Sequence, residues 1–133
     1  MIGFAHRGAR AEAPENTLEA FSLALRLGAT GIESDAWVTS DGCAVLDHDG
    51  VVRQRWRRVP IAQVARADLP AHVPALDDLY AACGRDFELS LDLKDADALD
   101  AVLASVRAGG APERLWACHS SVRTLAAWRA QAE

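Results

Sequence analysis

The chain has 133 residues, and half of them are hydrophobic, so it can form one domain with a sizeable core. Its formal charge of -5 argues against a dedicated nucleic-acid-binding protein, because such proteins usually carry a net basic face. The 3 cysteines match neither a disulfide framework nor a zinc pattern, and no apolar run reaches the roughly 18 residues of a membrane span. The chain also begins without the basic start of a signal peptide, so we expect a cytoplasmic protein.

Short apolar runs alternate along the chain with helical patterns, which is typical of an α/β fold with a parallel sheet covered by helices. Residues 2–5 are the first predicted strand. Asn16 is the predicted N-cap of the first helix, because Glu19 follows three residues later and apolar residues then recur at helical spacing. Gly28 is the predicted end of that helix.

The second predicted strand, residues 31–38, carries two carboxylates, Glu33 and Asp35. Side chains alternate between the two faces of a strand, so both carboxylates point the same way. If that face is an interior, two unpaired negative charges persist only with a cation beside them, and a metal ion is the usual one. The turn at 39–42 is followed by another extended run at 43–47.

Residues 49–74 are the least regular part of the sequence and resemble an insertion. Four arginines surround Trp56 in this segment, namely Arg53, Arg55, Arg57 and Arg58. A membrane-binding or phosphate-binding patch is one interpretation of the cluster. We favour the other, a solvated loop, and assign no secondary structure here.

The second half of the chain continues the alternation of strands and helices. A helix is predicted at 76–83 and another at 96–108, and 115–118 begins a fourth strand before a last helix capped by Ser121. Residues 87–94 alternate apolar and polar side chains almost perfectly. Either this is an antiparallel surface strand with a solvated polar face, or it is a barrel strand whose polar face looks into the active-site mouth. The pattern alone does not choose between them.

Two histidines, His6 and His48, each follow an apolar run and have a charged residue directly after them. With the carboxylates and an arginine, they could perform acid–base chemistry on a phosphate. A single histidine at a strand end is more often structural than catalytic, so the hypothesis depends on the whole set. His119 also follows a predicted strand, but it belongs to no motif and we favour a structural role for it.

Six short motifs occur in one order along the chain: His6-Arg7-Gly8, Pro14-Glu15-Asn16-Thr17, Glu33-x-Asp35, Thr39-x-Asp41-Gly42, His48-Asp49 and Asp92-x-Lys94. This series resembles the glycerophosphodiester phosphodiesterase family, within the superfamily of phosphatidylinositol-phospholipase-like phosphodiesterases. The resemblance is clear from residue 2 to about residue 94 and fainter beyond. It implies a (β/α)8 TIM barrel with its active site at the carboxyl ends of the strands.

The resemblance also implies a role for each matching residue. The acid–base pair would be His6 and His48. One divalent cation, Mg or Ca, would be bound by Glu33, Asp35 and Asp92. The phosphate would be bound by Arg7 and Lys94. The family usually has glutamate where this chain has Asp92, so that ligand is one methylene shorter. Glu15 would either support the site or serve only as an acid at a helix start.

The implied reaction is hydrolysis of glycerophosphodiesters to glycerol 3-phosphate and an alcohol, with a small-molecule phosphodiester as the partner. A lysophospholipid substrate keeps the same site and is one alternative. The other is a non-catalytic half-barrel that retains the motifs by descent.

The length of the chain does not match a complete barrel of this type. Such a barrel needs about 250 residues, and 133 residues supply about four strand–helix units. We therefore expect residues 1–133 to be the N-terminal half of such a domain, with two unpaired sheet edges. A fragment of a longer protein and a half-barrel that self-associates are the two interpretations.

Overall fold

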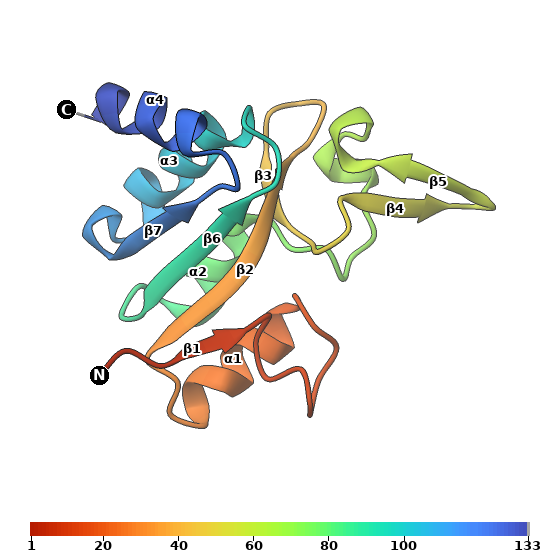
Figure 1. The fold of residues 1–133 in the computed structure, drawn as a ribbon. Coiled ribbons are helices and arrows are strands. Elements are labelled where there is room, and N and C mark those ends of the chain that lie inside the picture. The colour runs from red at the N-terminus through yellow and green to blue at the C-terminus, as the bar shows by residue number, and fades with distance from the viewer. Residues whose placement is uncertain (133) are drawn as a thin grey trace.

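The computed structural model describes residues 1–132 of the chain. Four parallel strands form the body of a five-stranded sheet, in the order β1-β2-β6-β7 (Figure 1). These strands are β1 (Phe4–His6), β2 (Gly31–Val38), β6 (Glu88–Leu93) and β7 (Leu115–Cys118). The fifth strand, β3 (Ala44–Leu46), pairs antiparallel with the end of β2.

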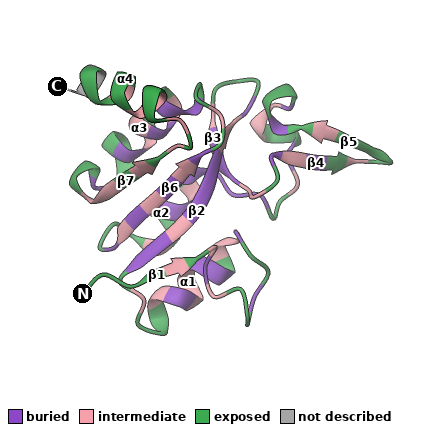
Figure 2. Cartoon of the chain, viewed as in Figure 1, coloured by how far each residue is buried: buried purple, intermediate pink, exposed green. Residues whose placement is uncertain are grey.

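Each of the four parallel strands is followed along the chain by one main helix. The helices are α1 (Leu18–Arg26), α2 (Leu76–Cys83), α3 (Ala98–Gly109) and α4 (Val122–Ala132). Apolar side chains of α1, α2 and α3 form one buried core with β2 and β6, and Figure 2 shows the buried residues along these two strands. No helix in the described part of the chain is long and apolar enough to cross a bilayer.

Strand β6 decides between the two interpretations of residues 87–94. Leu89, Leu91 and Leu93 are buried, whereas Ser90 and Asp92 on the other face are partly exposed. The strand has a parallel partner on each side, β2 and β7, so it lies inside a parallel sheet. The barrel-strand interpretation is correct, and the polar face is the one opposite the helices.

The predicted N-cap of the first helix is wrong by one residue. Thr17 is the N-cap, and its hydroxyl accepts a hydrogen bond from the Ala20 amide. Asn16 is buried and has a left-handed backbone with φ of 55°. Its amide oxygen accepts a hydrogen bond from the Ser34 hydroxyl at 2.8 Å, so this residue ties the helix start to β2.

Residues 49–74 are more regular than a solvated loop. They contain a hairpin of β4 (Val51–Gln54) and β5 (Arg57–Pro60), followed by two 3-10 turns. A second core lies under the segment and is made of Val45, Val52, Ile61, Val64, Leu69, Val73 and Ala75. The scattered apolar residues of the segment therefore close over β3 instead of remaining in solvent.

The four strand–helix units form an open sheet within the described residues. Strand β1 pairs only with β2, and β7 pairs only with β6, so each has one unpaired side. Phe4 and Trp116 are both exposed and contact each other edge to face, with ring centroids 6.4 Å apart. This arrangement is the expected α/β architecture with only part of a (β/α)8 sheet.

Candidate active site

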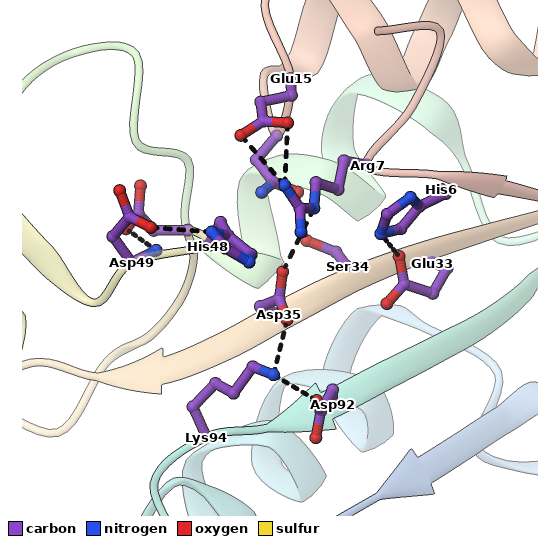
Figure 3. A network of polar contacts seen from close by, with 12 residues as sticks. His6, Arg7, Glu15, Glu33, Ser34, Asp35, His48, Asp49, Asp92 and Lys94 are labelled. Carbon is purple, nitrogen blue, oxygen red and sulfur yellow. Dashed lines mark hydrogen bonds and ion pairs between the residues drawn. The ribbon is translucent and has the colours of Figure 1, made fainter.

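Apart from His48, the predicted site residues lie on or directly after β1, β2 and β6, toward the carboxyl edge of the sheet. The parallel register places His6 beside Glu33 and places Asp35 beside Asp92. Residues that are level in neighbouring parallel strands point to the same face of the sheet, so side chains from distant parts of the sequence meet here. Figure 3 shows this group of polar side chains above the strands.

Arg7 lies in a tight bend directly after β1. Its backbone has φ of 59°, its amide donates to the Glu33 carbonyl at 2.8 Å, and its own carbonyl accepts from the Asn16 amide at 3.0 Å. The guanidinium lies between two carboxylates, 3.1 Å from Glu15 and 3.8 Å from Asp35 (Figure 3). Glu15 is thus paired with Arg7, which is the contact it would make if it supported the site.

Glu33 and Asp35 are partly and almost fully buried, respectively, on the polar face of β2. One oxygen of each, Glu33 Oε2 and Asp35 Oδ2, is buried without a hydrogen-bond partner. Burial raises the pKa of the Glu33 carboxyl above its ordinary value of 4.5, His6 beside it acts in the opposite direction, and Asp35 raises it further. The His6 Nε2 atom is 3.5 Å from Glu33 Oε2.

Lys94 lies between the carboxylates of Asp35 and Asp92. Its ammonium is 3.3 Å from Asp35 Oδ1 and 2.5 Å from Asp92 Oδ2. The hydrogen bond to Asp92 is the largest cause of a raised Lys94 pKa, and the contacts with Asp35 add to it. Asp92 is therefore held by Lys94 in this arrangement.

The three expected metal ligands share one edge of the sheet but do not surround one point. Among the residues that the structure describes, no group of three His, Cys, Asp or Glu side chains is placed to hold a metal ion. The pair from β2 nevertheless fits a hard cation, because it offers carboxylate oxygens, two of them buried and without a hydrogen-bond partner. The Asp92 oxygen Oδ2 is taken by Lys94, so this oxygen could join Glu33 and Asp35 only if Lys94 released it.

His48 lies in the turn that follows β3. The Asp47 carboxylate accepts hydrogen bonds from the Asp49 amide at 3.0 Å and the Gly50 amide at 2.8 Å, which fixes the turn. The His48 Nδ1 atom is 2.7 Å from Asp49 Oδ1. In Figure 3, His48 and His6 lie on opposite sides of Arg7 and Asp35.

A hollow of about 350 Å³ adjoins the carboxylates on the side of β7. It is lined by Glu33, Ser90, Asp92, Cys118, His119 and Ser120. His119 therefore borders the candidate site, although no motif pointed to it. Its place directly after the fourth predicted strand was the available signal, because that position also lies at the carboxyl edge of the sheet.

A family model and several known proteins match the chain. The model of the glycerophosphoryl diester phosphodiesterase family covers residues 6–115. The uncharacterized protein YqiK of Bacillus subtilis is 36% identical over 109 residues, which are 70% of this chain and 45% of that protein.

Solved structures share the fold. The glycerophosphodiester phosphodiesterase of Thermotoga maritima has a TM-score of 0.82 and 27% identity, covering 94% of this chain and 57% of that one. A phosphodiesterase of Oleispira antarctica, solved with the product sn-glycerol-3-phosphate, has a TM-score of 0.83 and 22% identity, covering 98% of this chain and 62% of that one. The chain thus spans about half of the matched Bacillus protein and roughly three fifths of these structures, and the partial-barrel fold is confirmed.

Proposed function

The chain belongs to the glycerophosphoryl diester phosphodiesterase family, and from that premise we propose that its site hydrolyses glycerophosphodiesters to glycerol 3-phosphate and an alcohol. The observation that carries the proposal is the pair of buried carboxylate oxygens on β2 that have no hydrogen-bond partner, with Arg7 and Lys94 next to the pair. Paired carboxylates and two cations at one strand edge suit a phosphate held through both a metal ion and direct contacts. The product bound by the Oleispira antarctica protein supports a small phosphorylated glycerol as the ligand.

Arg7 and Lys94 would bind the phosphoryl oxygens. A guanidinium donates two parallel hydrogen bonds to phosphate, and an ammonium supplies a compact positive charge. Arg7 is held in place by Glu15, so little ordering of its side chain is left for substrate binding. Charge that develops on the phosphoryl oxygens in the transition state is stabilised by the same two groups.

His6 and His48 would divide the proton transfers. One takes the proton from the attacking hydroxyl, which we propose is a neighbouring hydroxyl of the glycerol moiety, while the other gives a proton to the departing alkoxide. Water then completes the hydrolysis. Imidazole is the side chain suited to both tasks at neutral pH. Asp49 orients His48 through Nδ1, and Glu33 lies against the Nε2 atom of His6.

Glu33 and Asp35, joined by Asp92, would hold one divalent cation, Mg or Ca. When bound, such an ion would neutralise negative charge on the phosphate. It would also relieve the mutual repulsion of the two β2 carboxylates, which is part of why the Glu33 pKa is raised. A cation shared by Asp35 and Asp92 would compete with Lys94 for both of them, and the released ammonium could then turn to the substrate.

Self-association of the chain is a second proposal about this sheet. Phe4 and Trp116 are 40% and 52% exposed, and both lie on strands with one unpaired side. A second copy could cover these rings and pair with the open edges. Sedimentation of the 133-residue chain tests this, and a monomer at all concentrations would contradict it.

The test of the proposed function is hydrolysis of glycerophosphocholine by the chain extended to a complete barrel, with Mg or Ca and with a chelator in place of the metal. We expect metal-dependent release of choline, which Asp35→Asn abolishes, and little or no release by residues 1–133 alone. Glu113→Gln is the matched control, because this exposed acid precedes β7 at the opposite end of the strands. Cation binding without hydrolysis would favour the non-catalytic half-barrel, and hydrolysis only of lysophosphatidylcholine would favour the lipid alternative.

A further inference from the structure

The hairpin of β4 and β5 projects from the body of the molecule, on the side of β3 (Figure 1). Val52 and Val59 are level with each other in its two strands, and both contact the second core. Arg55 and Trp56 form the two-residue connection at the tip. The base of the hairpin is thus fixed to the fold, and its tip extends into solvent.

The hairpin is strongly basic in a chain that is acidic overall. It carries Arg53, Arg55, Arg57 and Arg58, which are four of the 14 lysines and arginines, and it holds no acidic residue. None of the four forms an ion pair with any residue that the structure describes. Arg53 and Arg58 stand directly opposite each other across the strands, where like charges destabilise a hairpin.

The tip combines backbone strain with an exposed aromatic side chain. Trp56 is 80% exposed, the most of the large rings in the described chain. Arg55 has φ of 55° at the first central position of the connection, where hairpin turns favour glycine. Strained backbone clusters at binding sites and switch regions, so the tip is a candidate binding element.

We propose that the β4–β5 hairpin docks on the surface of an anionic phospholipid bilayer. Tryptophan prefers the interface between headgroups and acyl chains, and arginines bind lipid phosphates and are attracted by an anionic surface. A single exposed ring at a tip, flanked by arginines on both strands, fits a lipid surface better than a nucleic acid. Nucleic acids require an extended basic face, whereas these four arginines are confined to one short hairpin.

One headgroup phosphate could bind beside Arg53 and Arg58, which lie opposite each other in the hairpin. A hollow of about 400 Å³ is lined there by Asp49, Val51, Val52, Arg53 and Arg58. A phosphate between Arg53 and Arg58 would relieve their repulsion, because it is attracted to both. Asp49 is the one acidic residue of the lining, and it is paired with His48.

Docking would also orient the candidate active site. Strand β4 begins two residues after Asp49, so the hairpin continues directly from the turn that carries His48. A lipid surface bound by the hairpin would therefore lie next to this side of the site. The inference itself does not depend on hydrolysis, since it concerns binding alone.

Co-sedimentation with vesicles tests the proposal on the whole chain. Two vesicle types are needed, phosphatidylcholine alone and an equal mixture of phosphatidylcholine and phosphatidylglycerol. We expect binding only to the mixture, weakened by salt, with a change in tryptophan emission that Trp56→Phe removes. Each arginine near an anionic surface contributes about fivefold in affinity, so Arg53→Gln with Arg58→Gln should weaken binding by about 25-fold.

Matched variants distinguish binding through the hairpin from a general effect of the net charge of the chain. Arg26→Gln with Arg123→Gln removes the same charge from exposed helical sites and should weaken binding far less. Inorganic phosphate at the same ionic strength should not compete, because the surface supplies many phosphates at once. Three results would overturn the proposal. The chain could bind neutral and anionic vesicles equally, Trp56→Ser could leave binding to anionic vesicles unchanged, or the two double arginine variants could weaken binding by the same factor. Circular dichroism confirms that each variant is folded.

Discussion

Gly8, in the bend that carries Arg7, should not tolerate a side chain. It has φ of 81°, and a Cβ added to it would lie 2.7 Å from the backbone carbon of Ala20 in α1. The next residue, Ala9, donates its amide to the Ala20 carbonyl at 2.9 Å, so the bend is pressed against the helix. Moving it away would also displace Arg7, whose amide and carbonyl hold it to β2 and Asn16.

Gly8→Ala is therefore expected to lower the free energy of unfolding by two separate effects. An alanine in the left-handed region costs about 1 kcal/mol or slightly more. Forcing a methyl group against backbone that is already packed adds about 1–3 kcal/mol. The sum, roughly 2–4 kcal/mol, is a large share of the roughly 5–15 kcal/mol that stabilises a typical domain.

Gly42→Ala is the control, because Gly42 has φ of 82° and nothing within 4 Å of an added Cβ. It shares the backbone cost and the reduced freedom of the unfolded chain, so both terms cancel in the comparison. Urea unfolding followed by circular dichroism should show a lower midpoint for Gly8→Ala than for Gly42→Ala, with unchanged slopes. Equal midpoints would refute the argument that contact with Ala20 requires glycine at Gly8.

Three further predictions concern the site and its support. Ser34→Ala should lower the free energy of unfolding by about 1–3 kcal/mol, because it leaves the buried Asn16 oxygen without its donor; unchanged urea midpoints would contradict this. In the absence of divalent cations, Glu33→Gln should raise the free energy of unfolding at neutral pH, because the raised pKa of Glu33 means that folding opposes ionisation of this carboxyl. The gain should vanish below pH 4.5, the ordinary pKa of the group, and a gain that does not depend on pH would contradict this reasoning. His6→Ala and His48→Ala should each lower turnover of an active form about a hundredfold, and unchanged turnover in both would leave the mechanism without proton carriers.

The period-two patterns predicted the sheet well because a parallel barrel strand has one apolar and one polar face. Leu89, Leu91 and Leu93 are buried as the alternation required, and Glu33 and Asp35 share the polar face. Placing the strands beside one another needed the resemblance, since periodicity alone left residues 87–94 ambiguous. The parallel pairing with β2 is a long-range property that no local window contains.

The errors have local physical causes. Asn16 is a good capping residue, but its side chain is taken by Ser34, and Thr17 caps the helix in its place. The hairpin at 51–60 was not predicted because its connection, Arg55-Trp56, contains neither glycine nor asparagine. Its strands are stabilised by contacts with Val45 and residues beyond the hairpin, which sequence-local reasoning does not reach.

The pairing of charges in the site could not be predicted either. The spacing of Glu33 and Asp35 on one strand face predicted that the carboxylates would need positive charge nearby, and a metal ion was the expected source. In the fold, Arg7 and Lys94 already lie within 4 Å of Asp35, whereas Glu33 has only His6 and keeps a buried, unpartnered oxygen. A cation is therefore needed most at Glu33, which has less positive charge beside it than Asp35 has, and the sequence alone treats the two carboxylates as equivalent.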